Sequence, residues 1–68
     1  MNKNDKPFDA DLIEFDGSTR RCVAYPSTYR EIFLRGTPIL DFVTVAFADN
    51  VIDEVDPRWL RQVKRRRR

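Results

Sequence analysis

ILDFVTVAFA, residues 39–48, is the most apolar stretch of this 68-residue chain. In an extended strand, Val43, Val45 and Phe47 fall on one face, and further apolar residues fall on the other. Apolar residues on both faces are typical of a central strand that is covered on both sides. We therefore expect the fold to form around this segment.

A β-hairpin is predicted ahead of this strand, from residues 11–16 and 19–25. Gly17 lies between the two strands after an aspartate, and glycine adopts the positive φ of a tight turn without steric cost. The register that follows places Ile13 opposite Cys22, which joins apolar residues on one face.

A short helix is predicted after the hairpin, over residues 29–35. Pro26 is expected to end the preceding strand because it cannot donate a backbone hydrogen bond. Thr28 and Glu31 have the spacing of a capping box, in which each side chain satisfies a free backbone amide at the start of a helix. Gly36 suits the position just past a helix end.

A fourth, shorter strand is predicted over residues 51–55, after a turn at Asp49 and Asn50. Asp53 and Glu54 give this strand the charge that natural proteins place on exposed sheet edges.

The last predicted element is a helix that starts at Asp56 and Pro57. Aspartate is a favoured capping residue, and proline is favoured at the first helical position. Trp59, Leu60 and Val63 then form an apolar stripe at helical spacing, so we expect Trp59 to be buried where the helix docks on the sheet.

These segments predict one small α+β domain, with a mostly antiparallel four-stranded sheet and two helices in the order β-β-α-β-β-α. Residues 1–7 are expected to be a flexible segment, residues 8–64 the domain, and residues 65–68 a basic tail. Folding of so short a chain buries only about 60% of the surface that the unfolded chain exposes. Its stability must come from the apolar core, a partner or a second copy.

The charge of the chain is separated along its length. Residues 57–68 carry seven bases and no acid, for a formal charge of +7, whereas residues 1–56 carry six bases and all eleven acids, for −5. A basic segment next to an acidic body is typical of proteins that bind an anionic partner.

The basic segment is our leading candidate site, as a contact for the phosphates of nucleic acid or of a nucleic-acid-processing complex. Phosphate contacts position a protein but do not read sequence, so this pattern does not distinguish RNA from DNA. The predicted contact residues are Arg58, Arg61, Lys64, Arg65, Arg66, Arg67 and Arg68.

The alternative is a compact inhibitor or adaptor that binds an enzyme through its sheet edge and an acidic face. Its contact residues are Asp49, Asp53 and Glu54. Small regulators encoded by phages and plasmids have this size and charge density, although that analogy is one of scale. A homodimer formed by pairing of edge strands is a third interpretation.

Catalysis, metals and cofactors are not expected. The chain has no histidine, its acidic segments do not match a calcium-loop template, and it has no phosphate-binding glycine loop. Cys22 is expected to be a small buried hydrophobic residue. No apolar run approaches the roughly 20 residues that span a membrane, and the first residues do not resemble a signal peptide. We therefore expect a soluble, cytoplasmic, non-enzymatic protein without a membrane partner.

Overall fold

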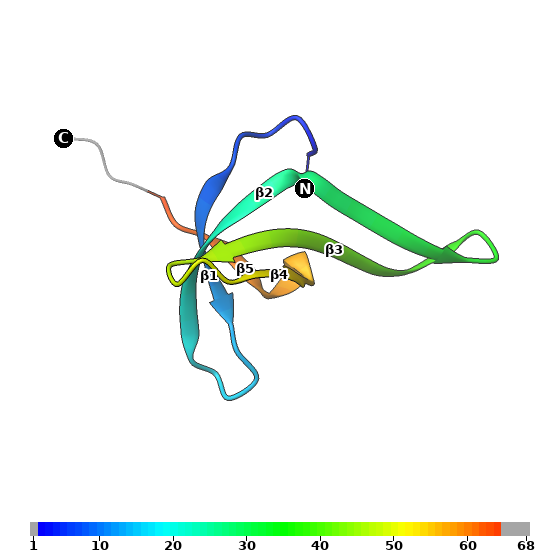
Figure 1. Cartoon of the computed structure of the whole chain (residues 1–68). Coiled ribbons are helices and arrows are strands. Elements are labelled where there is room, and N and C mark those ends of the chain that lie inside the picture. The colour runs from blue at the N-terminus through cyan, green and yellow to red at the C-terminus, as the bar shows by residue number, and fades with distance from the viewer. Residues whose placement is uncertain (1, 65–68) are drawn as a thin grey trace.

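The protein, described over residues 2–64 by a computed structural model, consists of five antiparallel strands (Figure 1). Their order in the sheet is β4-β3-β2-β1-β5. The strands are β1 (Phe8–Ile13), β2 (Thr19–Leu34), β3 (Thr37–Phe47), β4 (Ile52–Val55) and β5 (Leu60–Gln62). One 3₁₀ turn, η1 (Pro57–Trp59), precedes β5. The predicted α+β class is therefore wrong, since the described residues form no α-helix and the sheet has a fifth strand.

Residues 29–35, predicted as a helix, are instead the end of β2 and the start of a hairpin turn. Arg35 and Gly36 have positive φ angles of 51° and 80°. Two such residues in succession form the type I′ turn, whose twist matches that of paired strands. Gly36 therefore marks a hairpin turn and not the end of a helix.

Pro26 does not end β2 but lies buried within it, at a bulge. The pairing with β3 passes from Tyr25 opposite Thr44 to Arg30 opposite Phe42, so the intervening residues of β2 bulge out. A bulge is one of the few places where a sheet accepts proline. Thr28, predicted as a helix cap, closes this bulge: its hydroxyl donates to the carbonyl of Tyr25 at 2.6 Å and accepts from the backbone N–H of Thr44 at 2.8 Å.

The second predicted helix begins as expected but ends after one turn. Asp56 accepts a hydrogen bond from the backbone N–H of Arg58, and Pro57 occupies the first position of η1. Leu60 then pairs with Leu12 of β1, and the chain continues as β5. A helix of two turns is marginal in water, whereas strand pairing satisfies the free edge of β1 and packs Leu60 against the core. The prediction that Trp59 is buried is wrong, since 57% of it is exposed.

Other sequence predictions agree with the structure. β3 covers most of the predicted central strand, and β4 is an edge strand after a turn in which Asn50 has a φ of 66°. The first hairpin also forms, with Gly17 at a φ of 88°. Its register differs from the predicted one, because the backbone N–H of Glu14 donates to the carbonyl of Ser18 and closes a longer loop. Ala10, and not Ile13, therefore lies opposite Cys22.

The core lies on one face of the curled sheet and draws on all five strands. Cys22 is 3% exposed, as predicted for a small buried hydrophobic residue, and burial raises the pKa of its thiol. The buried cluster consists of Ala10, Cys22, Ala24, Val45 and Phe47, with Phe8, Leu12, Val55 and Leu60 packed against it.

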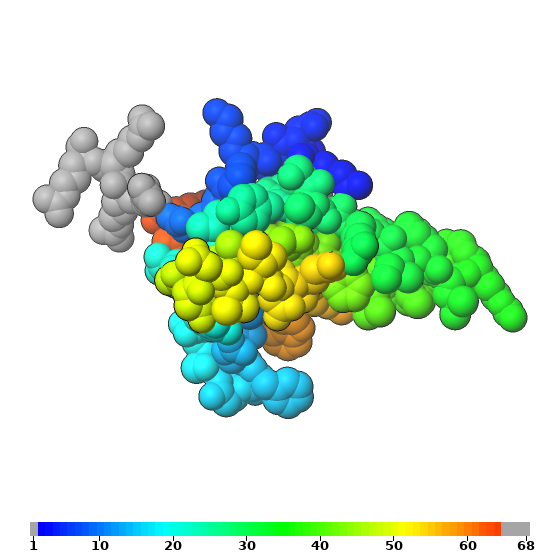
Figure 2. Space-filling view, viewed as in Figure 1, coloured from blue at the N-terminus to red at the C-terminus, as the bar shows by residue number. Residues whose placement is uncertain are grey.

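The hairpin of β2 and β3 extends beyond the body of the molecule as an arm (Figures 1 and 2). We define the arm as residues 30–42. Several of its large apolar side chains are exposed: Ile32, Phe33, Leu34, Ile39 and Leu40. The expectation that this strand is covered on both sides is therefore wrong at its outer end, which no described element covers.

Thr28 provides a test of the bulge. Thr28→Val keeps the shape of the side chain but removes the hydroxyl, so it should lower the free energy of unfolding by about 1–2 kcal/mol through the two lost hydrogen bonds. Thr28→Ser keeps the hydroxyl and should melt close to the parent protein. Thermal unfolding followed by circular dichroism measures both, and equal melting of the valine and serine variants would contradict this role.

Candidate nucleic-acid interface

The three predicted basic residues that the structure describes lie along one edge of the sheet. Arg58 belongs to η1, Arg61 to β5, and Lys64 follows β5; all three are exposed. Residues 65–68, the remainder of the predicted site, lie outside the described residues. Residues 2–64 carry nine bases and eleven acids, so the positive charge of the chain depends on these last arginines.

Arg58 is held by Asp56 at the start of η1. Its Nη2 lies 2.7 Å from Asp56 Oδ2, and its backbone N–H donates to Asp56 Oδ1 at 2.9 Å. Hydrogen bonds from Arg58 lower the pKa of Asp56, and the same pairing raises the pKa of Arg58. The pair thus fixes the turn that directs the chain into β5.

Arg61 belongs to a row of charges on adjacent strands. Asp11 of β1 lies opposite both Arg61 of β5 and Arg21 of β2. Arg21 Nε donates to Asp11 Oδ1 at 2.7 Å, and Arg61 Nη2 lies 3.9 Å from Asp11 Oδ2. Hydrogen bonding to Asp11, with a smaller effect of the charge of Asp9, raises the pKa of Arg21. The row orients both guanidinium groups at the surface.

Two exposed aromatic residues lie beside this edge. Trp59 is 57% exposed and Phe15 is fully exposed, and both line a hollow of about 360 Å³ together with Ile13 and Glu14. The sequence interpretation missed both residues as candidate contacts, and it placed Trp59 in the core. For Phe15 a signal existed, because it directly precedes the Asp16-Gly17 turn, where a side chain has little structure to pack against. The hollow can receive a flat apolar group.

The acidic residues of the alternative site lie on and next to β4. Arg20 Nη2 is 3.6 Å from Asp49 Oδ2, and Arg30 forms an ion pair with Glu54. Asp53 accepts a hydrogen bond from the backbone N–H of Glu54. Two of the three predicted acids are therefore paired with arginines of β2, which weakens the acidic character of this edge.

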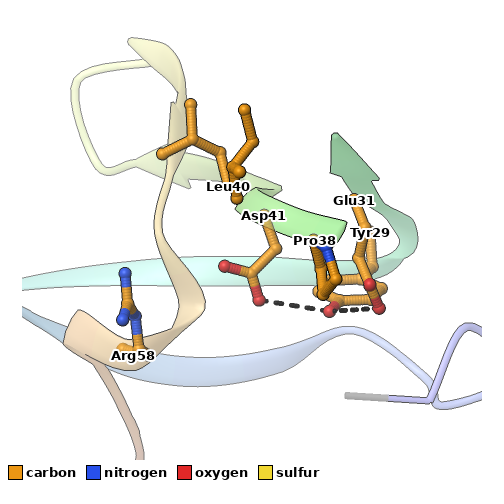
Figure 3. Close-up of a pocket in the computed structure, with 7 residues that line it drawn as sticks. Tyr29, Glu31, Pro38, Leu40, Asp41 and Arg58 are labelled. Carbon is orange, nitrogen blue, oxygen red and sulfur yellow. Dashed lines mark hydrogen bonds between the residues drawn. The ribbon is translucent and has the colours of Figure 1, made fainter. Parts of the chain in front are cut away.

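A second hollow, of about 250 Å³, lies at the base of the arm (Figure 3). The hydroxyl of Tyr29 lies between two carboxylates, 3.0 Å from Glu31 Oε1 and 3.1 Å from Asp41 Oδ2, with Arg58 across the hollow. Desolvation, followed by these hydrogen bonds, raises the pKa of Tyr29 to about 12. The neutral phenol has one proton to donate, and the two carboxylates compete to accept it.

Comparison with protein-family models, with curated proteins and with solved structures finds no match to this chain. Within residues 2–64, no group of histidine, cysteine and acidic side chains has an arrangement that could hold a metal ion. No helix in this part of the chain is long and apolar enough to cross a bilayer. Any functional assignment therefore rests on the surface just described.

Tyr29 gives a pH prediction. Because its pKa is raised in the folded protein, its contribution to stability is complete below the ordinary value of about 10 and is lost as the pH rises toward about 12. The tyrosinate absorbance of the parent minus that of Tyr29→Phe should have its midpoint near pH 12. A difference titration centred near pH 10 would contradict the hydrogen-bonded geometry.

Proposed function

We propose that this protein is a small non-enzymatic module that binds nucleic acid, or a complex containing it, along the β5 edge. The observation that carries this proposal is the pair of exposed aromatic residues, Trp59 and Phe15, at one hollow beside β5, the strand that carries Arg61. Proteins that bind single strands combine such stacking surfaces with cations that follow the phosphate backbone. The geometry therefore favours a single-stranded ligand over a duplex.

Each part of the surface has a distinct task in this proposal. Trp59 and Phe15 stack on a base, and Glu14 at the same hollow accepts hydrogen bonds from the amino groups of that base. Arg61 and Lys64 contact the neighbouring phosphates. Residues 65–68 supply four further cations, which an acidic body needs in order to attract a polyanion.

The aromatic residues are tested by Trp59→Ala and Phe15→Ala. Each should weaken binding of a labelled single-stranded oligonucleotide by about 1–3 kcal/mol, the usual worth of one stacked base. Fluorescence anisotropy at low salt measures this loss. Both variants should melt close to the parent because these side chains are exposed. Ile52→Ala removes a side chain of similar exposure (70%) on β4 and is the matched control.

Unchanged oligonucleotide affinity in both aromatic variants would overturn the stacking proposal. A large drop in the melting temperature of Trp59→Ala would instead indicate that this residue has a structural role.

The role of the cations is tested by the dependence of the binding affinity on salt concentration. If about four of them contact phosphates of a single strand, log affinity should fall with log salt at a slope near −2.8, about −0.7 for each phosphate. Deletion of residues 65–68 should make this slope much shallower and weaken binding to all sequences alike. Absence of binding at low salt, or binding that does not respond to salt, would exclude the proposed role.

A protein partner is the second candidate, favoured by the free edge of β4 and by its exposed Ile52. An inhibitor or adaptor of this kind would add β4 to a strand of an enzyme, with Asp49, Asp53 and Glu54 beside it. The double change Asp53→Lys and Glu54→Lys should then slow association with that enzyme, while deletion of residues 65–68 should have little effect. The opposite pattern supports the nucleic-acid proposal.

A further inference from the structure

One edge of the arm is open. β1 pairs with β2 only as far as Ala24, so beyond it no described strand covers the side of β2 that faces away from β3. Lys3 approaches this side near Tyr29, at a shallow hollow, but Phe33 and Leu34 are 55% and 60% exposed. An open, apolar strand edge is a template for pairing with another strand.

The other edge of the arm is less suited to pairing. The type I′ turn closes on Leu34 and Thr37, so the next pair, Phe33 and Pro38, directs its backbone groups outward. Proline has no N–H, and the outer edge of β3 therefore lacks a donor at this position. Phe33 presents both a donor and an acceptor on the edge of β2. Pairing at the arm is thus favoured on the β2 side.

The sequence of this edge is complementary to itself. Residues 31–35 read EIFLR. In an antiparallel alignment of two copies centred on Phe33, Ile32 lies opposite Leu34, and Glu31 comes opposite Arg35, the first turn residue just beyond the end of β2. Charges of opposite sign and apolar side chains are the cross-strand pairs that stabilise sheets.

We propose that the edge formed by residues 31–35 pairs with the same edge of a second copy of this chain, about a two-fold axis at Phe33. This arrangement is an isologous interface, in which each residue contacts its counterpart in the alignment above. It joins the two sheets into one and covers the apolar edge of both arms. The inference does not depend on the proposed function, since the hollow at Trp59 and Phe15 shares no residue with this edge.

The extent of the pairing sets its strength. Five residues of each chain overlap, which is small compared with the 20–30 residues a side of a stable interface. We therefore expect a reversible dimer that forms as the concentration rises. The two-fold symmetry gives the interface two pairs of Glu31 and Arg35, so one substitution changes both pairs. The affinity of so short an interface is therefore sensitive to charge.

The experiment is a charge exchange between these two residues, measured by sedimentation equilibrium of nuclease-treated protein from about 10 μM to about 1 mM. Glu31→Arg places like charges opposite each other, and so does Arg35→Glu. Each variant alone should dimerise at least about tenfold more weakly than the parent. An equimolar mixture of the two variants restores both opposite-charge pairs, and should form a heterodimer with about the parent affinity. The double variant should form a homodimer of similar affinity.

The controls separate this edge from the rest of the sheet. Glu31→Arg removes one acceptor of the Tyr29 hydroxyl, but Asp41 remains, and thermal melting verifies that the fold is kept. Ile52→Arg changes the edge of β4 and should leave the dimer intact. A parent that stays monomeric to about 1 mM, a mixture that fails to associate, or a dimer lost only in Ile52→Arg would each overturn the proposal.

Discussion

The structure depends on one constraint: a single sheet must bury its own inner face, because the described residues provide no second layer. β2 makes this possible by pairing with β1 on one side and β3 on the other. The side chains on the inner face are small at its centre, at Ala10, Cys22 and Ala24, and large at Phe47. Small residues on the concave side let the strands bend toward one another, so that Leu60 of β5 reaches the same core as β3.

The residue preferences within a segment were enough to predict those elements that do not depend on a distant partner. The apolar run of residues 39–48 indicated β3, and Asp56, which was predicted to cap a helix, caps the single turn η1. The two helix predictions were wrong because the sequence patterns behind them are also compatible with another structure. A glycine after an apolar run ends a helix or forms a hairpin turn, and the choice depends on whether β3 is there to pair with residues 30–34. That pairing is non-local and cannot be read from the segment alone.

The candidate site could be predicted only in part, because it too depends on non-local pairing. The cations were evident from composition, but their partners were not, since Asp11 meets Arg61 only because β5 returns to β1. Trp59 was assigned to the core from a helical spacing that does not exist in the structure. Once the chain is extended from Leu60, that residue enters the core and Trp59 is left at the surface. A wrong secondary structure therefore concealed the feature on which the proposed function rests.

The arm raises a different physical question, because a two-stranded ribbon is only marginally stable in water. Few side-chain contacts join it to the body: Arg30 pairs with Glu54, and the hydroxyl of Tyr29 donates to Glu31 or Asp41. These surface contacts contribute little individually. None of the buried core residues belongs to the stretch from Arg30 to the tip. Association at the edge of β2 would therefore contribute to the order of the arm itself, and part of the free energy of pairing would be spent on that ordering. In the proposed dimer, pairing would therefore order the arm without adding to the buried core, and a charge altered near the tip should weaken pairing more than it destabilises the body.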